Sequence, residues 1–268
     1  TTYVNEQIEE IETDIINIKG IDVLNCRPNI YGSEIWTEQY TGELLTDFKN
    51  AGFTQICLNV GQTMVNDVVS TVARVDYIIA KCAELGLNIS AVKMSTYNYL
   101  TGINLKDVIT TQTQFDSLKA NILNVASKFD PDDLEYFIAY NENPAYADPF
   151  TELYSTPVYG TEISRASVLS TIQALNTLGF KTGISFLGLR DVGHCNSDIL
   201  SALSMVGVNY YPSPWVDIRG VHTSALDVEN ALRSLGFLEA MESIRRDLTK
   251  NVVITEIGIT PYLSNIIH

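Results

Sequence analysis

The segment YFIAYNENPAY, residues 136–146, changes character at its midpoint. Its first five residues are apolar or aromatic, and Asn141 and Glu142 follow at once. A continuous apolar run of this length is typical of a strand that is buried on both faces, as in a parallel sheet. The polar residues therefore stand where the predicted strand leaves the core.

Similar apolar, β-branched runs recur along the chain and alternate with segments of helical period. Strands are predicted at residues 21–26, 53–60, 87–94, 134–141, 181–187, 206–211 and 252–257. Helices are predicted at residues 33–50, 66–85, 111–128, 161–178, 197–205 and 225–249. In NAGF, ELGL and TLGF a glycine that can end a helix precedes the next strand. Repeated β/α units of this kind predict the α/β fold class with a parallel sheet.

A closed (β/α)8 TIM barrel is favoured over an open dinucleotide-binding sheet. The loop after the first predicted strand, CRPNIYGSE, lacks the glycine-rich phosphate turn of the open form. Only GITPYLSNIIH follows the last predicted strand, so the barrel, residues 20–268, is expected to be incomplete at its eighth strand. An eighth unit would then come from residues outside this chain.

Residues 1–19 carry a separate pattern. Apolar residues are spaced 4, 3, 4 and 3 apart, which is a heptad seam with isoleucine at nearly every core position: Val4, Ile8, Ile11, Ile15 and Ile18. This pattern predicts a short N-terminal helix or coiled-coil stalk that could join the chain into a homotrimer. A helix packed on the bottom of its own barrel fits the same seam, because two heptads do not separate the alternatives.

Composition excludes several classes of function. A net charge of -15 opposes binding to nucleic acid. No apolar run approaches the roughly 20 residues of a membrane span, and no signal peptide is recognisable. With three histidines and four widely spaced cysteines, Cys26, Cys57, Cys82 and Cys195, we expect free thiols, no metal site and no cofactor. The chain begins with Thr, so we expect a piece of a longer protein, with an extracellular or virion-associated location favoured.

Two carboxylates lie where a β/α barrel places its chemistry, at the carboxyl ends of strands. Glu142 follows the fourth predicted strand, and Glu256 lies at the end of the seventh, in NVVITEIGITPY. These strands face each other across the barrel mouth, so both groups can reach one bound molecule. Two such carboxylates can divide glycoside hydrolysis between them, with Glu142 as the acid and Glu256 as the nucleophile.

With NE after the fourth strand and TE at the seventh, the sequence resembles the clan A glycoside hydrolases, which are retaining β/α barrels. VGVNYYPSPW also looks like the YYP.W segment of the β-1,4-galactanase family, and the β-mannanase families have a similar strand. The resemblance implies that Tyr210 or Tyr211 hydrogen-bonds Glu256 and that Asn141 contacts the 2-hydroxyl of the sugar. The polar groups usual in this clan after strands two and three are not obvious in LNVGQT and VKMSTYNY.

The sequence thus predicts a retaining glycoside hydrolase that cleaves a β-linked polysaccharide. Trp36 and Trp215 could stack on sugar rings or anchor loops, and Arg27 could pair with Glu256. One alternative is an inactive carbohydrate-binding barrel in a phage-tail or surface adhesion protein, which would bind a bacterial cell-surface glycan. A second is a lyase or aldolase with a Schiff base at Lys93, although a salt bridge also explains that residue. His194 has no nucleophile motif around it, and we interpret it as a loop residue.

Overall fold

The computed structural model describes residues 29–32, 37–71, 74–95, 97–98, 103–105, 109–141, 162–186, 192, 195–210, 245–247 and 249–257. Within them lies a seven-stranded sheet with the order β1-β2-β5-β8-β9-β10-β11, in which every neighbouring pair is parallel. The strands are β1 (Asn29–Gly32), β2 (Gln55–Val60), β5 (Asn88–Ser95), β8 (Tyr136–Asn141), β9 (Thr182–Phe186), β10 (Met205–Tyr210) and β11 (Asn251–Ile257). Neighbours in this sheet are also successive along the chain, which is the strand order of a TIM barrel.

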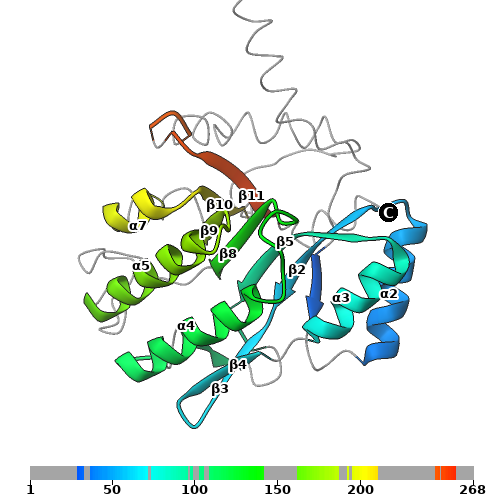
Figure 1. Ribbon diagram of the computed structural model, residues 1–268, viewed down its shortest axis with the longest axis horizontal. Helices are drawn as coiled ribbons and strands as arrows, with labels where there is room; N and C mark the ends of the chain where they lie inside the picture. The colour runs from blue at the N-terminus through cyan, green and yellow to red at the C-terminus, as the bar shows by residue number, and fades with distance from the viewer. Residues whose placement is uncertain are drawn as a thin grey trace, which may run out of the picture.

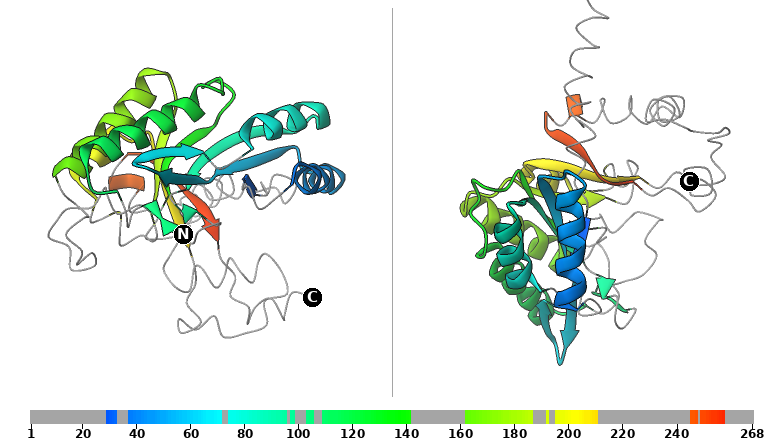
Figure 2. Two further views of the ribbon diagram at one scale, coloured as in Figure 1. Left: turned by 90° about the horizontal axis from the view of Figure 1, so that it is seen from below. Right: turned by 90° about the vertical axis from the view of Figure 1, so that its right-hand side faces the viewer.

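Helices lie along one side of this sheet, as Figures 1 and 2 show. They are α2 (Glu38–Asn50), α3 (Val75–Leu85), α4 (Gln112–Ala126), α5 (Glu162–Thr177) and α7 (Ser197–Ala202). Gly52, Gly86 and Gly179 all have positive φ, and each precedes a strand of the sheet, so the predicted helix-to-strand turns are confirmed. Thr111 and Gln114 form a capping box at the start of α4.

The two faces of the strands differ sharply in chemistry. Side chains that alternate along the strands pack with the helices into one buried apolar cluster; they include Ile56, Leu58, Val60, Val92, Met94, Ile184, Phe186, Val206 and Val208. The residues between them face the other side of the sheet, the barrel interior. Near the start of the strands Ile138 and Met205 pack closely over Gly183, where an added Cβ would lie 2.1 Å from the Met205 sulfur.

Part of the second predicted helix, residues 66–85, is wrong. The chain instead forms a hairpin of β3 (Gln62–Val65) and β4 (Val68–Thr71), and α3 begins only at Val75. Asn66 and Asp67 at its tip have φ values of 50° and 65°. Two successive residues with positive φ define the hairpin turn that suits twisted strands, and Asn and Asp tolerate that conformation.

The first strand of the sheet also differs from the prediction. β1 pairs with β2 in register Asn29 to Cys57, within a segment that the sequence pattern assigns to a loop. The predicted strand at residues 21–26, the N-terminal helix of residues 1–19 and any eighth strand after Ile257 lie outside the described residues. The predicted helix at 197–205 ends at Ala202, because β10 already begins at Met205. Most of the predicted helix at 225–249 also lies outside the described residues.

Candidate functional site

Polar side chains line the interior face of the sheet near the carboxyl ends of six neighbouring strands. Each lies within the last three residues of its strand: Asn59 on β2, Lys93 on β5, Asn141 on β8, Ser185 on β9, Asn209 on β10 and Thr255 on β11. The residues next to them in sequence, such as Leu58 and Val92, belong to the apolar cluster under the helices. Because side chains alternate along a strand, the polar ones point into the barrel. This is the end of the barrel where TIM-barrel enzymes place their active sites.

Four of these residues form one network, which we call the amide–hydroxyl cluster: Asn141, Ser185, Asn209 and Thr255. The Asn209 amide is its centre. Its Oδ1 accepts from Ser185 Oγ at 2.7 Å and from Thr255 Oγ1 at 2.7 Å, and its Nδ2 donates to Asn141 Oδ1 at 3.0 Å. The hydroxyls of Ser185 and Thr255 also contact each other. The network ties four neighbouring strands together and orients the Asn141 amide with its oxygen toward Asn209.

The remaining two residues, Asn59 and Lys93, form a second group, the β2–β5 pair. They lie opposite each other in the register of these strands, with exposed fractions of 2% and 1%. Asn59 Oδ1 is buried and has no hydrogen-bond partner in the described part of the chain. LNV and VKM thus each place one polar side chain within a strand, on the interior face of the sheet.

The structure describes some of the predicted site residues and not others. Asn141 is 9% exposed at the end of β8 and belongs to the amide–hydroxyl cluster. Glu256 lies on β11, where its backbone is in register with Asn209. The side chains of Glu256 and Tyr210 are outside what the structure describes, although both residues lie on strands. The other predicted site residues fall outside the described residues altogether: Arg27, Trp36, Glu142, Tyr211 and Trp215, as does His194.

Sequence reasoning missed Asn59, Ser185, Asn209 and Thr255. The signal that could have found them is a polar residue inside an apolar strand, one or two positions before its end. CLNV, GISF, GVNY and VITEI all show it. In a strand buried on both faces such a residue cannot reach water, so it must bond to another protein group or to a ligand.

Three of the four cysteines lie among the described residues. Cys57, Cys82 and Cys195 are buried free thiols, as predicted, and Cys26 lies outside the described residues. Burial raises the pKa of Cys82 to about 12, so this thiol is protonated at neutral pH. Among the described residues, no group of three or more His, Cys, Asp or Glu is arranged to hold a metal ion. In the same residues no helix is long and apolar enough to span a membrane.

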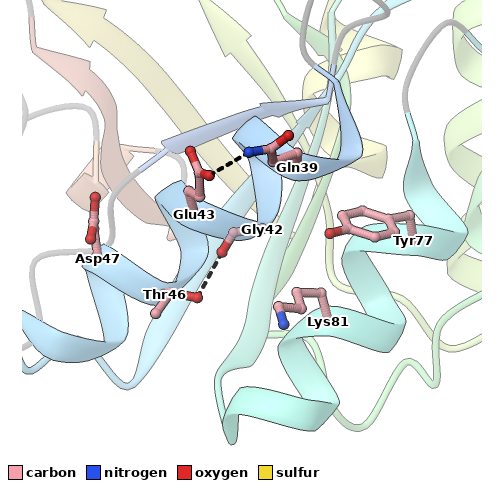
Figure 3. A pocket seen from close by; sticks show the side chains of 7 residues that line it. All are labelled: Gln39, Gly42, Glu43, Thr46, Asp47, Tyr77 and Lys81. Carbon is pink, nitrogen blue, oxygen red and sulfur yellow. Dashed lines mark hydrogen bonds between the residues drawn. The ribbon is translucent and has the colours of Figure 1, made fainter.

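A surface pocket lies away from this site, between α2 and α3. Figure 3 shows its lining side chains, which come from the outer helices: Gln39, Gly42, Glu43, Thr46, Asp47, Tyr77 and Lys81. The two helices approach closely here, because the Tyr77 hydroxyl donates to the carbonyl oxygen of Glu38 at 2.7 Å and lies beside Gly42. We assign the pocket to the packing of these helices rather than to chemistry at the barrel mouth.

No protein-family model and no curated protein matches the sequence. Solved structures do match. A glycoside hydrolase family 17 β-1,3-glucanosyltransferase from Rhizomucor miehei is 14% identical with a TM-score of 0.50, over 88% of this chain and 71% of that one. The endo-β-1,4-mannanase from Thermotoga petrophila is 14% identical with a TM-score of 0.50, over 87% of this chain and 60% of that one. β-Glucuronidase 2 from Bacteroides uniformis is 14% identical with a TM-score of 0.54, over 87% of this chain and 25% of that one.

At such low identity this similarity shows the fold alone. The chain shares the parallel β/α architecture of TIM-barrel glycoside hydrolases, in agreement with the fold class predicted from sequence. The roles of individual residues are not transferred by it, because one barrel fold supports many unrelated activities.

Proposed function

We propose that the protein is a retaining glycoside hydrolase that cleaves a β-linked polysaccharide. The observation that carries this proposal is the amide–hydroxyl cluster, which joins the carboxyl ends of β8 to β11. Glu142 follows Asn141 directly in sequence, and Glu256 is in register with Asn209. A buried network between the strands that carry the two glutamates would hold their backbones at a fixed separation, which a two-carboxylate mechanism requires.

In this mechanism Glu142 protonates the glycosidic oxygen while Glu256 attacks the anomeric carbon. The glycosyl–Glu256 ester is then hydrolysed by water, from which Glu142 takes a proton. The two carboxyl groups are expected to lie about 5 to 5.5 Å apart. Glu142 should titrate higher than Glu256, because the acid must hold a proton while the nucleophile stays charged.

The other predicted site residues have supporting roles. Tyr210 or Tyr211 would hold Glu256 ionised and oriented, and Asn141 would contact the 2-hydroxyl of the sugar. Arg27 would favour the charged form of the nucleophile. The indoles of Trp36 and Trp215 would stack on sugar rings at the barrel mouth.

The test is turnover of β-linked polysaccharides, measured as reducing ends, by the wild type and by Glu142→Gln and Glu256→Gln. We expect each substitution to lower kcat by at least about 1,000-fold, because each removes one covalent or proton-transfer step. Glu84→Gln is the matched control, since Glu84 lies exposed on α3 and pairs only locally with Lys81 at 2.7 Å. Unchanged turnover in both site variants would overturn the proposal. Glycan binding without wild-type turnover would indicate the alternative, a carbohydrate-binding adhesion barrel such as a phage-tail protein.

The trimer proposed from residues 1–19 has its own test. Light scattering should give a trimeric mass for the full chain and a lower mass for a form that begins at Lys19. A monomeric mass for both forms, with lower thermal stability in the shorter one, would show that this helix packs on its own barrel instead.

A further inference from the structure

We infer that Asn59 binds the substrate and that its Oδ1 accepts a hydrogen bond from a hydroxyl group of a neutral sugar in the barrel mouth. The inference rests on the proposed function, because it names a substrate contact of the same site. Asn59 lies one residue before the end of β2, and its side chain is 2% exposed. Its neighbours Leu58 and Val60 belong to the apolar cluster under the helices, so Asn59 points to the interior face.

The amide oxygen of Asn59 is the observation that carries the inference. Among the described residues it is the one buried side-chain nitrogen or oxygen atom without a hydrogen-bond partner. Native proteins leave few buried acceptors unpaired, because an acceptor that has lost its contact with water and gained no donor destabilises the fold. A donor on a bound molecule would pair this oxygen.

The interior becomes apolar toward the start of the strands. Two residues before Asn59, on the same face of β2, lies Cys57, which is in register with Ala91 of β5, and both are buried. Ile138 and Met205 are also buried outside the apolar cluster under the helices. A polar ligand is therefore expected to approach Asn59 from the carboxyl ends of the strands, where TIM-barrel enzymes bind their substrates.

The other polar groups at this end of the barrel limit the choice of ligand. Apart from Lys93, the interior side chains described there are neutral amides and hydroxyls. The amide oxygens of Asn141 and Asn209 already accept hydrogen bonds within the amide–hydroxyl cluster, whereas that of Asn59 accepts none among the described residues. A net charge of -15 also repels anions at long range. A neutral sugar fits these conditions, because each of its hydroxyl groups can donate to a carbonyl oxygen.

The test removes the donor and the acceptor separately. The probes are the methyl β-D-glycosides of glucose, mannose and galactose, each with its deoxy derivatives at C2, C3, C4 and C6. A deoxy derivative lacks a single hydroxyl group. Binding to the wild type and to variants of Asn59 is measured by titration calorimetry or ligand-observed NMR, with thermal melting of every variant as a check of folding.

We expect one deoxy derivative of the preferred glycoside to bind the wild type about 10-fold more weakly than its parent. Asn59→Leu should bind the parent about 10-fold more weakly and should no longer distinguish it from that derivative, because both changes remove the same hydrogen bond. Asn59→Asp should keep the distinction, since a carboxylate oxygen still accepts. The matched control is Asn124→Leu, the same substitution at an exposed position of α4, which should leave binding unchanged.

Two results would overturn the inference. One is a wild type that binds none of the glycosides. The other is a pattern of deoxy effects that is the same in the wild type and in folded Asn59→Leu, which would assign the amide oxygen of Asn59 to water. If the leucine variant does not fold, Asn59→Ala takes its place in the same comparison.

The outcome is separable from that of the proposed function. Cleavage of a polysaccharide that requires Glu142 and Glu256, with an unchanged KM and unchanged deoxy effects in Asn59→Leu, keeps the function and removes the inference. Discrimination between a glycoside and its deoxy derivative that depends on Asn59, in a protein without turnover, keeps the inference and removes the hydrolase.

Discussion

The amide–hydroxyl cluster and Asn59 of the β2–β5 pair lie on the same interior face of one sheet, yet the side-chain amides of Asn209 and Asn59 differ in their hydrogen bonds. In the cluster, Asn209 donates one hydrogen bond and accepts two. In the pair, Asn59 Oδ1 is buried without a hydrogen-bond partner among the described residues, and Asn59 lies opposite Lys93 in the register of β2 and β5. Both groups lie within the last three residues of their strands, so position along the strand does not explain the difference in hydrogen bonding.

The comparison distinguishes two roles of buried polar side chains. A group whose bonds are all made within the protein contributes to stability and fixes geometry, whereas an unsatisfied group lowers stability until a ligand completes it. The cluster therefore suits the task of holding the proposed catalytic strands in place. The amide oxygen of Asn59, in contrast, is available to accept a hydrogen bond from a bound molecule.

The largest effect is expected at the centre of the cluster. Asn209→Ala removes one acceptor and one donor, and it leaves the hydroxyls of Ser185 and Thr255 and the Asn141 oxygen without that partner. We expect a loss of about 3 kcal/mol in the free energy of unfolding, measured by urea denaturation. The control is Asn176→Ala, whose exposed amide donates once to Ala202 O at 2.8 Å and should cost no more than about 1 kcal/mol. Equal losses in the two variants would remove the distinction on which the comparison rests.

A smaller loss is expected when space beside the cluster is filled. In Gly207→Ala the new Cβ would lie 2.8 Å from Thr255 Cγ2 and 3.1 Å from the backbone oxygen of Ile184, so the strands themselves must move. We expect a cost of about 2 kcal/mol. In Gly183→Ala the contacts are the flexible ends of Met205 and Ile138, and the cost should be about 1 kcal/mol. A larger loss for Gly183→Ala in thermal or urea unfolding would contradict this order.

A satisfied polar pair on the helix side of the sheet should behave like the cluster, with a smaller effect. The Tyr140 hydroxyl donates to Thr171 Oγ1 of α5 at 3.0 Å, and both groups are buried. Tyr140→Phe should cost about 1 kcal/mol at neutral pH.

The same pair gives a dependence on pH. Burial raises the pKa of Tyr140 well above its ordinary value of about 10. Above that pH the unfolded chain loses the proton while the folded protein keeps it, so the wild type loses stability that Tyr140→Phe retains. The difference between the two proteins in urea unfolding should therefore shrink as the pH rises past about 10. A difference that stays constant would argue against burial as the cause.

The main sheet could be predicted because its signal is strong and local. Every predicted strand from residues 53–60 onward corresponds to an observed one, since continuous apolar runs of this length have few alternatives. β1 was missed because NIYG is short and carries no apolar run. The β3–β4 hairpin was missed because Asn66 and Asp67 were interpreted as a helix start, although two adjacent residues of this type also suit a turn with positive φ.

The site was less predictable than the fold. Asn141 could be identified because it ends a long apolar run, but the partners of its amide come from strands up to 68 residues away in sequence. Which polar residues in separate strands meet depends on strand register, which short apolar runs do not specify. The β-bulge between Val208 and Asn209 shows this, because it brings Glu256, rather than Thr255, into register with Asn209.

The smallest effect, and the sharpest test of the comparison, is expected at Asn59. Asn59→Leu replaces an amide with an apolar side chain of similar size, so it removes an unsatisfied acceptor without leaving a large cavity. We expect the free energy of unfolding to change by no more than about 0.5 kcal/mol or to rise slightly, because no hydrogen bond is lost among the described residues. Asn209→Leu, the same change in the cluster, should instead be strongly destabilising. Urea unfolding of the two leucine variants side by side measures the contrast. A large loss in the free energy of unfolding of Asn59→Leu would mean that Asn59 already stabilises the folded protein, as a member of the cluster does. Its amide oxygen would then not be available to a ligand.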